Sequence, residues 1–263
     1  MNMTAILIAV AVVSILGLII GLLLGVAGKK FEVETDERVE QVREYMAGSN
    51  CGGCGFAGCD ACAEAIVEGK AAPNACAPAG AAAAEAIGKI LGIAVEVGEP
   101  KVAFVRCAGT CDKTVMKSQY FGMQDCQKAA IIPGGTDKAC SYGCMGLGSC
   151  VKACKFDAIH IVNGVAVVDK EKCVACGACS AVCPKGLITM VPKKAEHLVR
   201  CSNRDKGKDV KAVCAAGCIG CGVCVKQCEV GAVSVINNVA VIDTEKCTNC
   251  GKCAAKCPSK CIS

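Results

Sequence analysis

The chain has 263 residues, of which 3% are aromatic and none is Trp, so an ordinary apolar core would be thin. Cysteine accounts for 27 residues, an odd number that cannot pair completely in disulfides within one chain, and the only two histidines, His160 and His197, exclude His-rich zinc and haem sites. The formal net charge of +5 comes without a basic cluster interleaved with aromatic side chains, so no nucleic-acid partner is expected.

The N-terminal segment, residues 1–28, has no charged side chain, and residues 5–27 form a nearly continuous apolar run. A helix that crosses a bilayer needs roughly 20 such residues, so this run predicts a single transmembrane anchor in contact with membrane lipid. A secretory signal peptide is the alternative, but it would have a basic start and a shorter apolar stretch. Lys29 and Lys30 follow the run, which predicts a single-pass protein of the inner (cytoplasmic) membrane with its cysteine-bearing body in the cytoplasm.

The predicted anchor carries Gly17, Gly21 and Gly25 four residues apart, on one face of the helix. Small residues at this spacing let membrane helices pack closely, which would make the protein one component of a membrane assembly. Glycine is also common in membrane helices in general, and both interpretations stay open.

The next segment, residues 29–95, is predicted to be a small helical domain with one [4Fe-4S] cluster. Helical spacing of apolar residues is present at 36–47, and an alanine-rich helix is expected at 81–91. Between them lies CGGCGFAGC, followed by PNACAP, which together offer four ligands: Cys51, Cys54, Cys59 and Cys76. The glycines in this loop let the backbone turn around an inorganic core.

Residues 96–139 are expected to form a loosely organised connecting segment that carries Cys107, Cys111 and Cys126. These three cysteines could form a sixth site with Cys201 as the fourth ligand. We prefer Cys201 to Cys214 as this ligand, because Cys214 aligns with Cys140 in the repeat, beside a site that is already complete. Structural or idle thiols are the alternative.

The rest of the chain contains a repeat with an offset of 74 residues. Unit 1 (residues 140–192) and unit 2 (residues 214–263) are joined by a linker (residues 193–213). VNGVAVVDKEKC in unit 1 matches INNVAVIDTEKC in unit 2, and each predicts a β-hairpin with a two-residue turn.

CVACGACSAVCP and CTNCGKCAAKCP match the run C-x2-C-x2-C-x3-C-P, in which three cysteines bind one cubane and the fourth binds its neighbour. This spacing is specific for iron–sulfur clusters, whereas a lone C-x2-C is often a zinc site. It predicts four ligand sets in the two units, Cys140, Cys144, Cys150 and Cys183; Cys154, Cys173, Cys176 and Cys179; Cys218, Cys221, Cys224 and Cys257; Cys228, Cys247, Cys250 and Cys253. In the first set the repeat places a ligand at position 147, but this residue is Leu147, and Cys140 is expected to take its place.

Lys155 and Glu229 follow Cys154 and Cys228, where ferredoxins usually carry Pro. A changed charge beside a cluster should shift its reduction potential. Five [4Fe-4S] clusters are expected in total, with a sixth left open. Because each site carries about −2 with its thiolates, five sites would change the net charge of the chain to about −5. The predicted fold class is α+β, with an anchor helix, a helical iron–sulfur domain and two ferredoxin-like units.

The order of an uncharged glycine-bearing helix, CGGCGFAGC with Cys76, and double-cubane units resembles the B subunits of the Rnf electron-transport complexes. KVAFVRCAGTC and the second ferredoxin unit resemble the long form found in clostridia and other anaerobes. The resemblance covers essentially the whole chain. It implies a protein that accepts electrons from reduced soluble ferredoxin and relays them to membrane and flavin-bearing Rnf subunits, in a complex that reduces NAD+ and translocates ions.

The residues themselves indicate an electron conduit, since no P-loop, catalytic triad or flavin fingerprint is present and no substrate-level catalytic site is expected in this chain. A polyferredoxin that feeds electrons to a membrane hydrogenase or another anaerobic oxidoreductase is the alternative function. A non-enzymatic iron–sulfur redox sensor would hardly need five sites.

Overall fold

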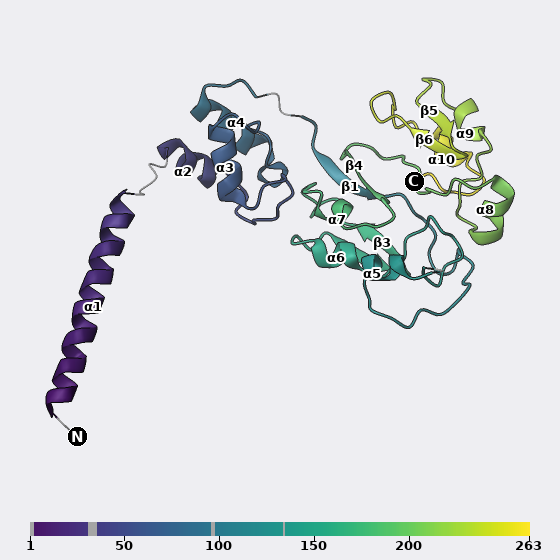
Figure 1. Ribbon diagram of the computed structural model, residues 1–263. Coiled ribbons are helices and arrows are strands. Elements are labelled where there is room, and N and C mark those ends of the chain that lie inside the picture. The colour runs from purple at the N-terminus through teal and green to yellow at the C-terminus, as the bar shows by residue number, and fades with distance from the viewer. Residues whose placement is uncertain (1–2, 31–35, 96–97, 134) are drawn as a thin grey trace.

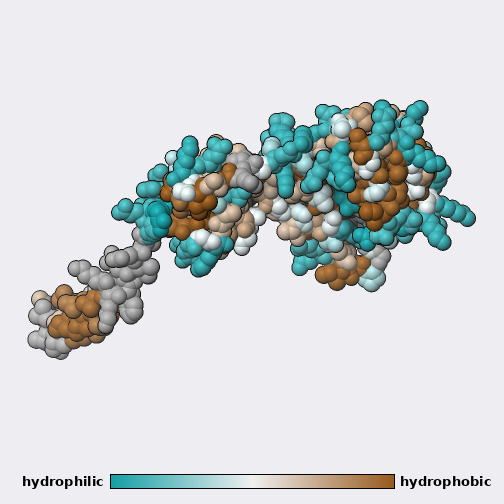
Figure 2. Space-filling model, turned by 90° about the horizontal axis from the view of Figure 1, so that it is seen from above, coloured by the Kyte–Doolittle hydropathy of each residue, from teal (hydrophilic) through white to brown (hydrophobic). Residues whose placement is uncertain are grey.

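The computed structural model describes residues 3–30, 36–95, 98–133 and 135–263. The first element is the helix α1 (Met3–Lys30), which extends away from the rest of the chain (Figure 1). Described side chains such as Leu18 and Leu22 are exposed, and the coloured atoms of this helix are largely brown in the space-filling view (Figure 2). Within the described part of the chain, no helix meets the length and apolarity required to cross a membrane.

The N-terminal domain is helical, as the sequence predicts. Its elements are α2 (Glu37–Glu44), α3 (Cys59–Val67), the 3-10 helix η1 (Ala77–Ala79) and α4 (Gly80–Leu91). Asp36 starts α2, because its carboxylate accepts the backbone N–H of Arg38 at 2.9 Å. The core of this domain contains Val42, Cys62, Ile66 and Ile87, each at most 2% exposed. The helices predicted at 36–47 and 81–91 are confirmed as α2 and α4.

The two predicted hairpins are confirmed. One pairs β2 (Ile159–Val162) with β3 (Val165–Val168), and the other pairs β5 (Val233–Ile236) with β6 (Val239–Ile242), both antiparallel. The two turn residues of each hairpin have positive φ, including Asn237 at 50°. Asn and Gly tolerate this backbone region, which is why these residues mark the turns in the sequence.

Four short helices carry cysteines of the two units. They are α6 (Ser149–Ala153), α7 (Ala178–Ala181), α9 (Val223–Lys226) and α10 (Lys252–Ala255). Each begins after a glycine with positive φ, for example Gly177 at 80° before α7. A residue with a Cβ is strained in that conformation, so glycine allows the cysteine loop to turn directly into a helix.

The connecting segment is more ordered than the sequence predicted. It contains β1 (Lys101–Val105), which pairs antiparallel with β4 (Ile188–Pro192) at the end of unit 1. It also contains α5 (Cys126–Ile131), and the linker contains α8 (Gly207–Val213). An isolated bridge joins Thr114 to Cys214. These long-range pairings attach the connecting segment to both unit 1 and the start of unit 2.

Each unit has its own apolar cluster, and the cysteines lie within it. In unit 1 the fully buried side chains include Ile159, Val165 and Leu187. In unit 2 the cluster includes Val233 and Val239 of the hairpin, together with neighbouring cysteines. Thin aliphatic layers therefore surround sulfur atoms in both units, as the low aromatic content implied.

Candidate iron–sulfur sites

One predicted set of unit 1 surrounds a cavity beside β1 and α7. The cavity encloses about 340 Å³ of space, part of it open to solvent, and four cysteines line it, Cys154, Cys173, Cys176 and Cys179. The backbone N–H of Ala103 in β1 donates to the sulfur of Cys173 at 3.3 Å. Apolar neighbours such as Ile159 and Met190 complete the wall.

An equivalent arrangement is present in unit 2. A cavity of about 330 Å³ is lined by four cysteines of the predicted set, Cys218, Cys221, Cys224 and Cys257. The N–H of Ala240 donates to the sulfur of Cys218 at 3.4 Å. Cys261 also lines this cavity, with its sulfur 3.6 Å from that of Cys257.

The second set of unit 2 follows the repeat of the sequence. Cys228, Cys247 and Cys253 belong to one apolar cluster, and Cys250 lies exposed in the same loop. The N–H of Asn249 donates to the sulfur of Cys247 at 3.5 Å. This loop is equivalent to the loop from Cys173 to Cys179 in unit 1.

The structure does not bring Cys140 to the cavity of the three cysteines that the sequence grouped with it. A cavity of about 360 Å³ is lined by Cys144, Cys150 and Cys183, and the fourth cysteine at this cavity is Cys126. Helix α5 begins at Cys126, and the N–H of Cys126 donates to the hydroxyl of Ser149. The connecting segment therefore reaches into unit 1 and takes the position that Leu147 leaves without a sulfur.

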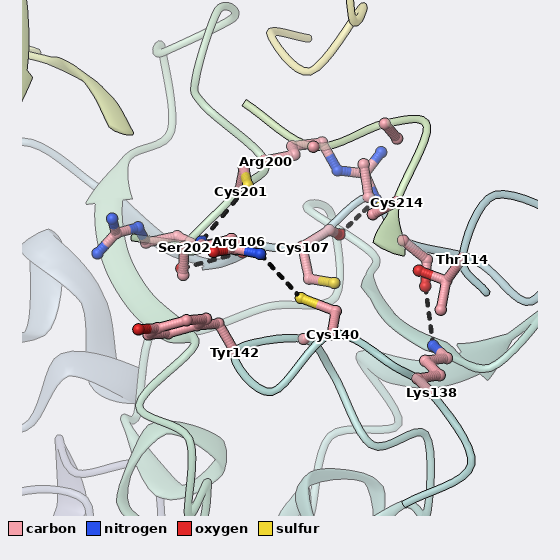
Figure 3. Close-up of a pocket in the computed structure, with 16 residues that line it drawn as sticks. Arg106, Cys107, Thr114, Lys138, Cys140, Tyr142, Arg200, Cys201, Ser202 and Cys214 are labelled. Carbon is pink, nitrogen blue, oxygen red and sulfur yellow. Dashed lines mark hydrogen bonds between the residues drawn. The ribbon is translucent and has the colours of Figure 1, made fainter. Parts of the chain in front are cut away.

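A further cavity of about 360 Å³ lies between the connecting segment, unit 1, the linker and the start of unit 2, and Cys140 is found there. Four cysteines from four stretches of chain line it, Cys107, Cys140, Cys201 and Cys214. Figure 3 shows these residues around the cavity, with Lys138 beside Thr114. The sequence grouped Cys107 with Cys201, which the structure also brings together, but it placed Cys111 and Cys126 here instead of Cys140 and Cys214.

Polar groups around this cavity are aimed at sulfur and at backbone oxygens. Asn203 is 2% exposed, and it donates its side-chain N–H to Cys140 at 3.6 Å and its backbone N–H to Cys201 at 3.5 Å. Lys138 is also buried, and its ammonium group donates to carbonyl oxygens of Gly109 and Gly164 at 2.8 and 2.6 Å.

The N-terminal set lies at the start of α3 and before η1. Cys59 and Cys76 are buried, Cys54 packs against the same core, and Cys51 is partly exposed. The loop is fixed by Asn50, whose side-chain oxygen accepts the N–H of Cys59 at 2.7 Å. All four predicted ligands therefore lie on one loop and the segment that precedes η1.

Burial raises the pKa of several of these thiols. It raises the pKa of Cys150 to about 12 and the pKa of Cys179 and Cys201 to about 11, because a low-polarity environment disfavours the thiolate. The shift of Cys218 has the opposite sign, since a hydrogen bond from Cys261 lowers its pKa to about 6. A bound metal would reverse the effect of burial by stabilising the thiolates.

The cysteine sets fit a multinuclear cluster better than a single ion. Among the described residues, no group of three or more Cys, His, Asp or Glu side chains converges closely enough to hold one metal ion. In a [4Fe-4S] cluster each of four irons takes its own thiolate, so the sulfurs surround a core and do not meet at a point. Four cavities, each lined by at least four cysteines and by apolar residues, with N–H donors aimed at sulfur, match that requirement.

Three cysteines remain outside the six sets. Cys62 and Cys261 are buried at 0% and 2% exposure, as expected for small apolar core residues. Cys111 is exposed, and its N–H donates to the carbonyl oxygen of Asn163 in the turn of the first hairpin. Cys111 therefore has a structural contact, and it lines none of the four cysteine cavities described above.

Three family models match the chain. The model "Putative Fe-S cluster" covers residues 46–78, the model "4Fe-4S binding domain" covers 166–189, and the model "4Fe-4S dicluster domain" covers 217–261. The first contains the N-terminal set, and the other two lie within units 1 and 2. Iron–sulfur binding is therefore supported in three separate parts of the chain.

The chain is similar over nearly its whole length to curated proteins. It is 48% identical to the B subunit of the Na(+)-translocating ferredoxin:NAD(+) oxidoreductase complex of Acetobacterium woodii, over 99% of this chain and 78% of that protein. It is 45% identical to the B subunit of the ion-translocating oxidoreductase complex of Methanosarcina acetivorans, over 97% and 96%. It is 42% identical to the B subunit of the proton-translocating ferredoxin:NAD(+) oxidoreductase complex of Clostridium ljungdahlii, over 99% and 93%.

Proposed function

The chain belongs to the family of B subunits of the Rnf-type, ion-translocating ferredoxin:NAD(+) oxidoreductase complexes, and from this membership we propose that it is the iron–sulfur electron-transfer component of such a complex. The observation that carries the proposal is the set of four cysteine-lined cavities in the connecting segment, the linker and the two units. Family membership favours this function over the alternative of a hydrogenase-feeding polyferredoxin.

We assign six [4Fe-4S] clusters to six ligand sets. Five of them are Cys51, Cys54, Cys59 and Cys76; Cys126, Cys144, Cys150 and Cys183; Cys154, Cys173, Cys176 and Cys179; Cys218, Cys221, Cys224 and Cys257; Cys228, Cys247, Cys250 and Cys253. The sixth is Cys107, Cys140, Cys201 and Cys214. When bound, such clusters store and pass single electrons.

The residues of this chain hold and insulate the clusters. The cysteines supply thiolates, the aliphatic walls exclude water, and N–H donors such as those of Ala103 and Asn203 stabilise charge on sulfur. In this proposal the chain itself needs no substrate-level catalytic site. The electron donor in the proposal is reduced soluble ferredoxin, and the electrons leave to membrane and flavin-bearing subunits of the complex.

The proposal includes a single-pass membrane anchor at residues 5–27, with the cysteine-bearing body on the cytoplasmic side. It is supported by the absence of charged residues from 1–28 in the sequence, by the helical conformation of Met3–Lys30 and by Lys29 and Lys30 at its end.

Anaerobic reconstitution of the full-length protein tests the assignment. We expect about 24 iron atoms and as many sulfides per chain, and visible absorption that bleaches when catalytic amounts of reduced ferredoxin are supplied with a reductant. A folded protein that holds zinc and remains colourless would contradict the proposal.

A further inference from the structure

Lys155 of unit 1 lies against the backbone of the N-terminal domain. Its ammonium group donates to the carbonyl oxygens of Ser49 at 3.2 Å and Asn50 at 2.7 Å. Lys155 directly follows Cys154, at the position where ferredoxin runs carry Pro. Since Pro has no donor group, the departure from the ferredoxin pattern is what makes this contact.

Asn50 connects this contact to the cysteines of the N-terminal domain. It precedes Cys51, and its side chain accepts the N–H of Cys59 at 2.7 Å. Its φ of 45° turns its backbone out of the extended conformation, as Asn tolerates. One residue therefore contacts Lys155 through its carbonyl oxygen and orders the cysteine loop through its side chain.

A second contact brings the same two loops together. A Cβ built on Gly53 would lie 2.0 Å from the carbonyl oxygen of Cys176, so the approach requires a residue without a side chain. Cys176 belongs to the same ligand set as Cys154. Two separate contacts therefore place the N-terminal cysteine loop against one ligand set of unit 1.

Docking of this kind has to be held by specific contacts. The apolar cluster of the N-terminal domain consists of residues between Val39 and Leu91, so the domain has a core of its own. Domains joined by small polar interfaces move relative to each other unless such contacts hold them. In unit 2 the equivalent residue, Glu229, pairs instead with Lys252 of the same unit.

We propose that Lys155 is a positioning residue that docks the N-terminal domain on unit 1, so that the ligand sets containing Cys51 and Cys176 lie side by side. The docking rests on the proposed function in one respect: adjacent ligand sets place two clusters next to each other, which matters only if the chain transfers electrons. The docking itself depends only on residues of this chain.

The test compares variants of the full-length, cluster-loaded protein by amide hydrogen exchange, iron content and electron paramagnetic resonance. In Lys155→Met we expect exchange at least about fivefold faster in both residues 49–55 and residues 173–177, with unchanged iron content. The magnetic interaction between reduced clusters should weaken as well. Lys155→Arg should preserve the wild-type behaviour, and Gly53→Ala should reproduce the effect of Lys155→Met.

The matched control is Lys185→Met, because Lys185 donates to the carbonyl oxygen of Ser141 within unit 1. It should leave exchange in both segments unchanged. Unchanged exchange in Lys155→Met and Gly53→Ala, or acceleration confined to one of the two segments, would overturn the docking. If the wild-type protein bound no iron and Lys155→Met still accelerated exchange in both segments, the proposed function would be contradicted and the docking supported.

Discussion

The backbone N–H of Cys126 donates a hydrogen bond of 2.6 Å to the hydroxyl of Ser149. Ser149 precedes Cys150 and is itself buried, at 7% exposure. This bond fixes the start of α5 against α6 and holds Cys126 at the cavity that contains Cys144 and Cys150. It explains why this cavity takes its fourth cysteine from the connecting segment.

The ligand assignment predicts different spectra for two single substitutions. Cys126→Ser and Cys140→Ser should each lower the iron content by up to about four atoms per chain, because each removes one ligand of a different cluster. The electron paramagnetic resonance signals that disappear should therefore differ between the two variants. Cys111→Ser is the control and should retain all iron. Loss of the same signal in both variants would return Cys140 to the set with Cys144.

Asn203 should tune the potential of the cluster bound by Cys140 and Cys201. Its side-chain N–H donates to the sulfur of Cys140, and a donor to sulfur stabilises the reduced, more negative cluster. Asn203→Leu should lower the midpoint potential of one cluster, by on the order of tens of millivolts. A redox titration followed by electron paramagnetic resonance measures this shift. A higher potential, or equal shifts of all clusters, would show that the hydrogen bond does not act on this site.

The stability of the N-terminal domain should decrease at alkaline pH. Burial, followed by a hydrogen bond with Cys54, raises the pKa of the Cys62 thiol from 9.0 to about 12. The unfolded chain then loses this proton at lower pH than the folded chain. The contribution to stability is therefore complete below about pH 9 and is lost as the pH rises from 9 towards 12.

Unfolding of the cluster-loaded protein by denaturant between pH 7 and 10.5 measures this slope. Cys62→Ala should reduce stability at pH 7, because it removes a buried sulfur, but it should flatten the alkaline slope. A variant with the slope of the wild type would assign the alkaline loss to other groups.

Removal of residues 2–28 should release the protein from membranes without loss of iron. The cysteine-bearing body has its own cores and ligand sets, whereas the proposed anchor contains no cysteine. Membrane fractionation and iron analysis check both statements. Recovery of the truncated protein in the membrane fraction would contradict the anchor.

In the full-length chain, Gly21→Leu should weaken co-purification with membrane partners, because the added side chain prevents close helix packing.

The cysteine spacing predicted which nearby cysteines share a cavity, and the structure groups some distant cysteines differently. Cys173, Cys176 and Cys179 lie on one loop, and the 74-residue repeat identified their partners because both copies fold alike. In the proposed ligand sets Cys126 and Cys140 exchange places, because the cavity that each of them lines depends on long-range pairing. The strand β1 and the bridge between Thr114 and Cys214 bring the connecting segment to unit 1 and to the start of unit 2, and neither has a local signal in the sequence.

The contact of Lys155 is a second feature that the sequence could not predict, because it also joins residues far apart in the chain. The departure from Pro was visible in the sequence, but only the structure shows that the ammonium group reaches Asn50, more than 100 residues earlier in the chain. From the sequence, the charge of Lys155 next to Cys154 suggested that it shifts the reduction potential of a cluster. Its described contacts are with backbone oxygens of another domain.

The site of Cys107, Cys140, Cys201 and Cys214 also bears on how the protein is made. Its first and last ligands are far apart in the chain, and unit 1 lies between them. During synthesis unit 1 can form its hairpin long before Cys214 has left the ribosome, so this site is completed only after most of the chain has been synthesised. Iron delivered early would meet three cysteines at most, and the residue that follows α8 would complete the site.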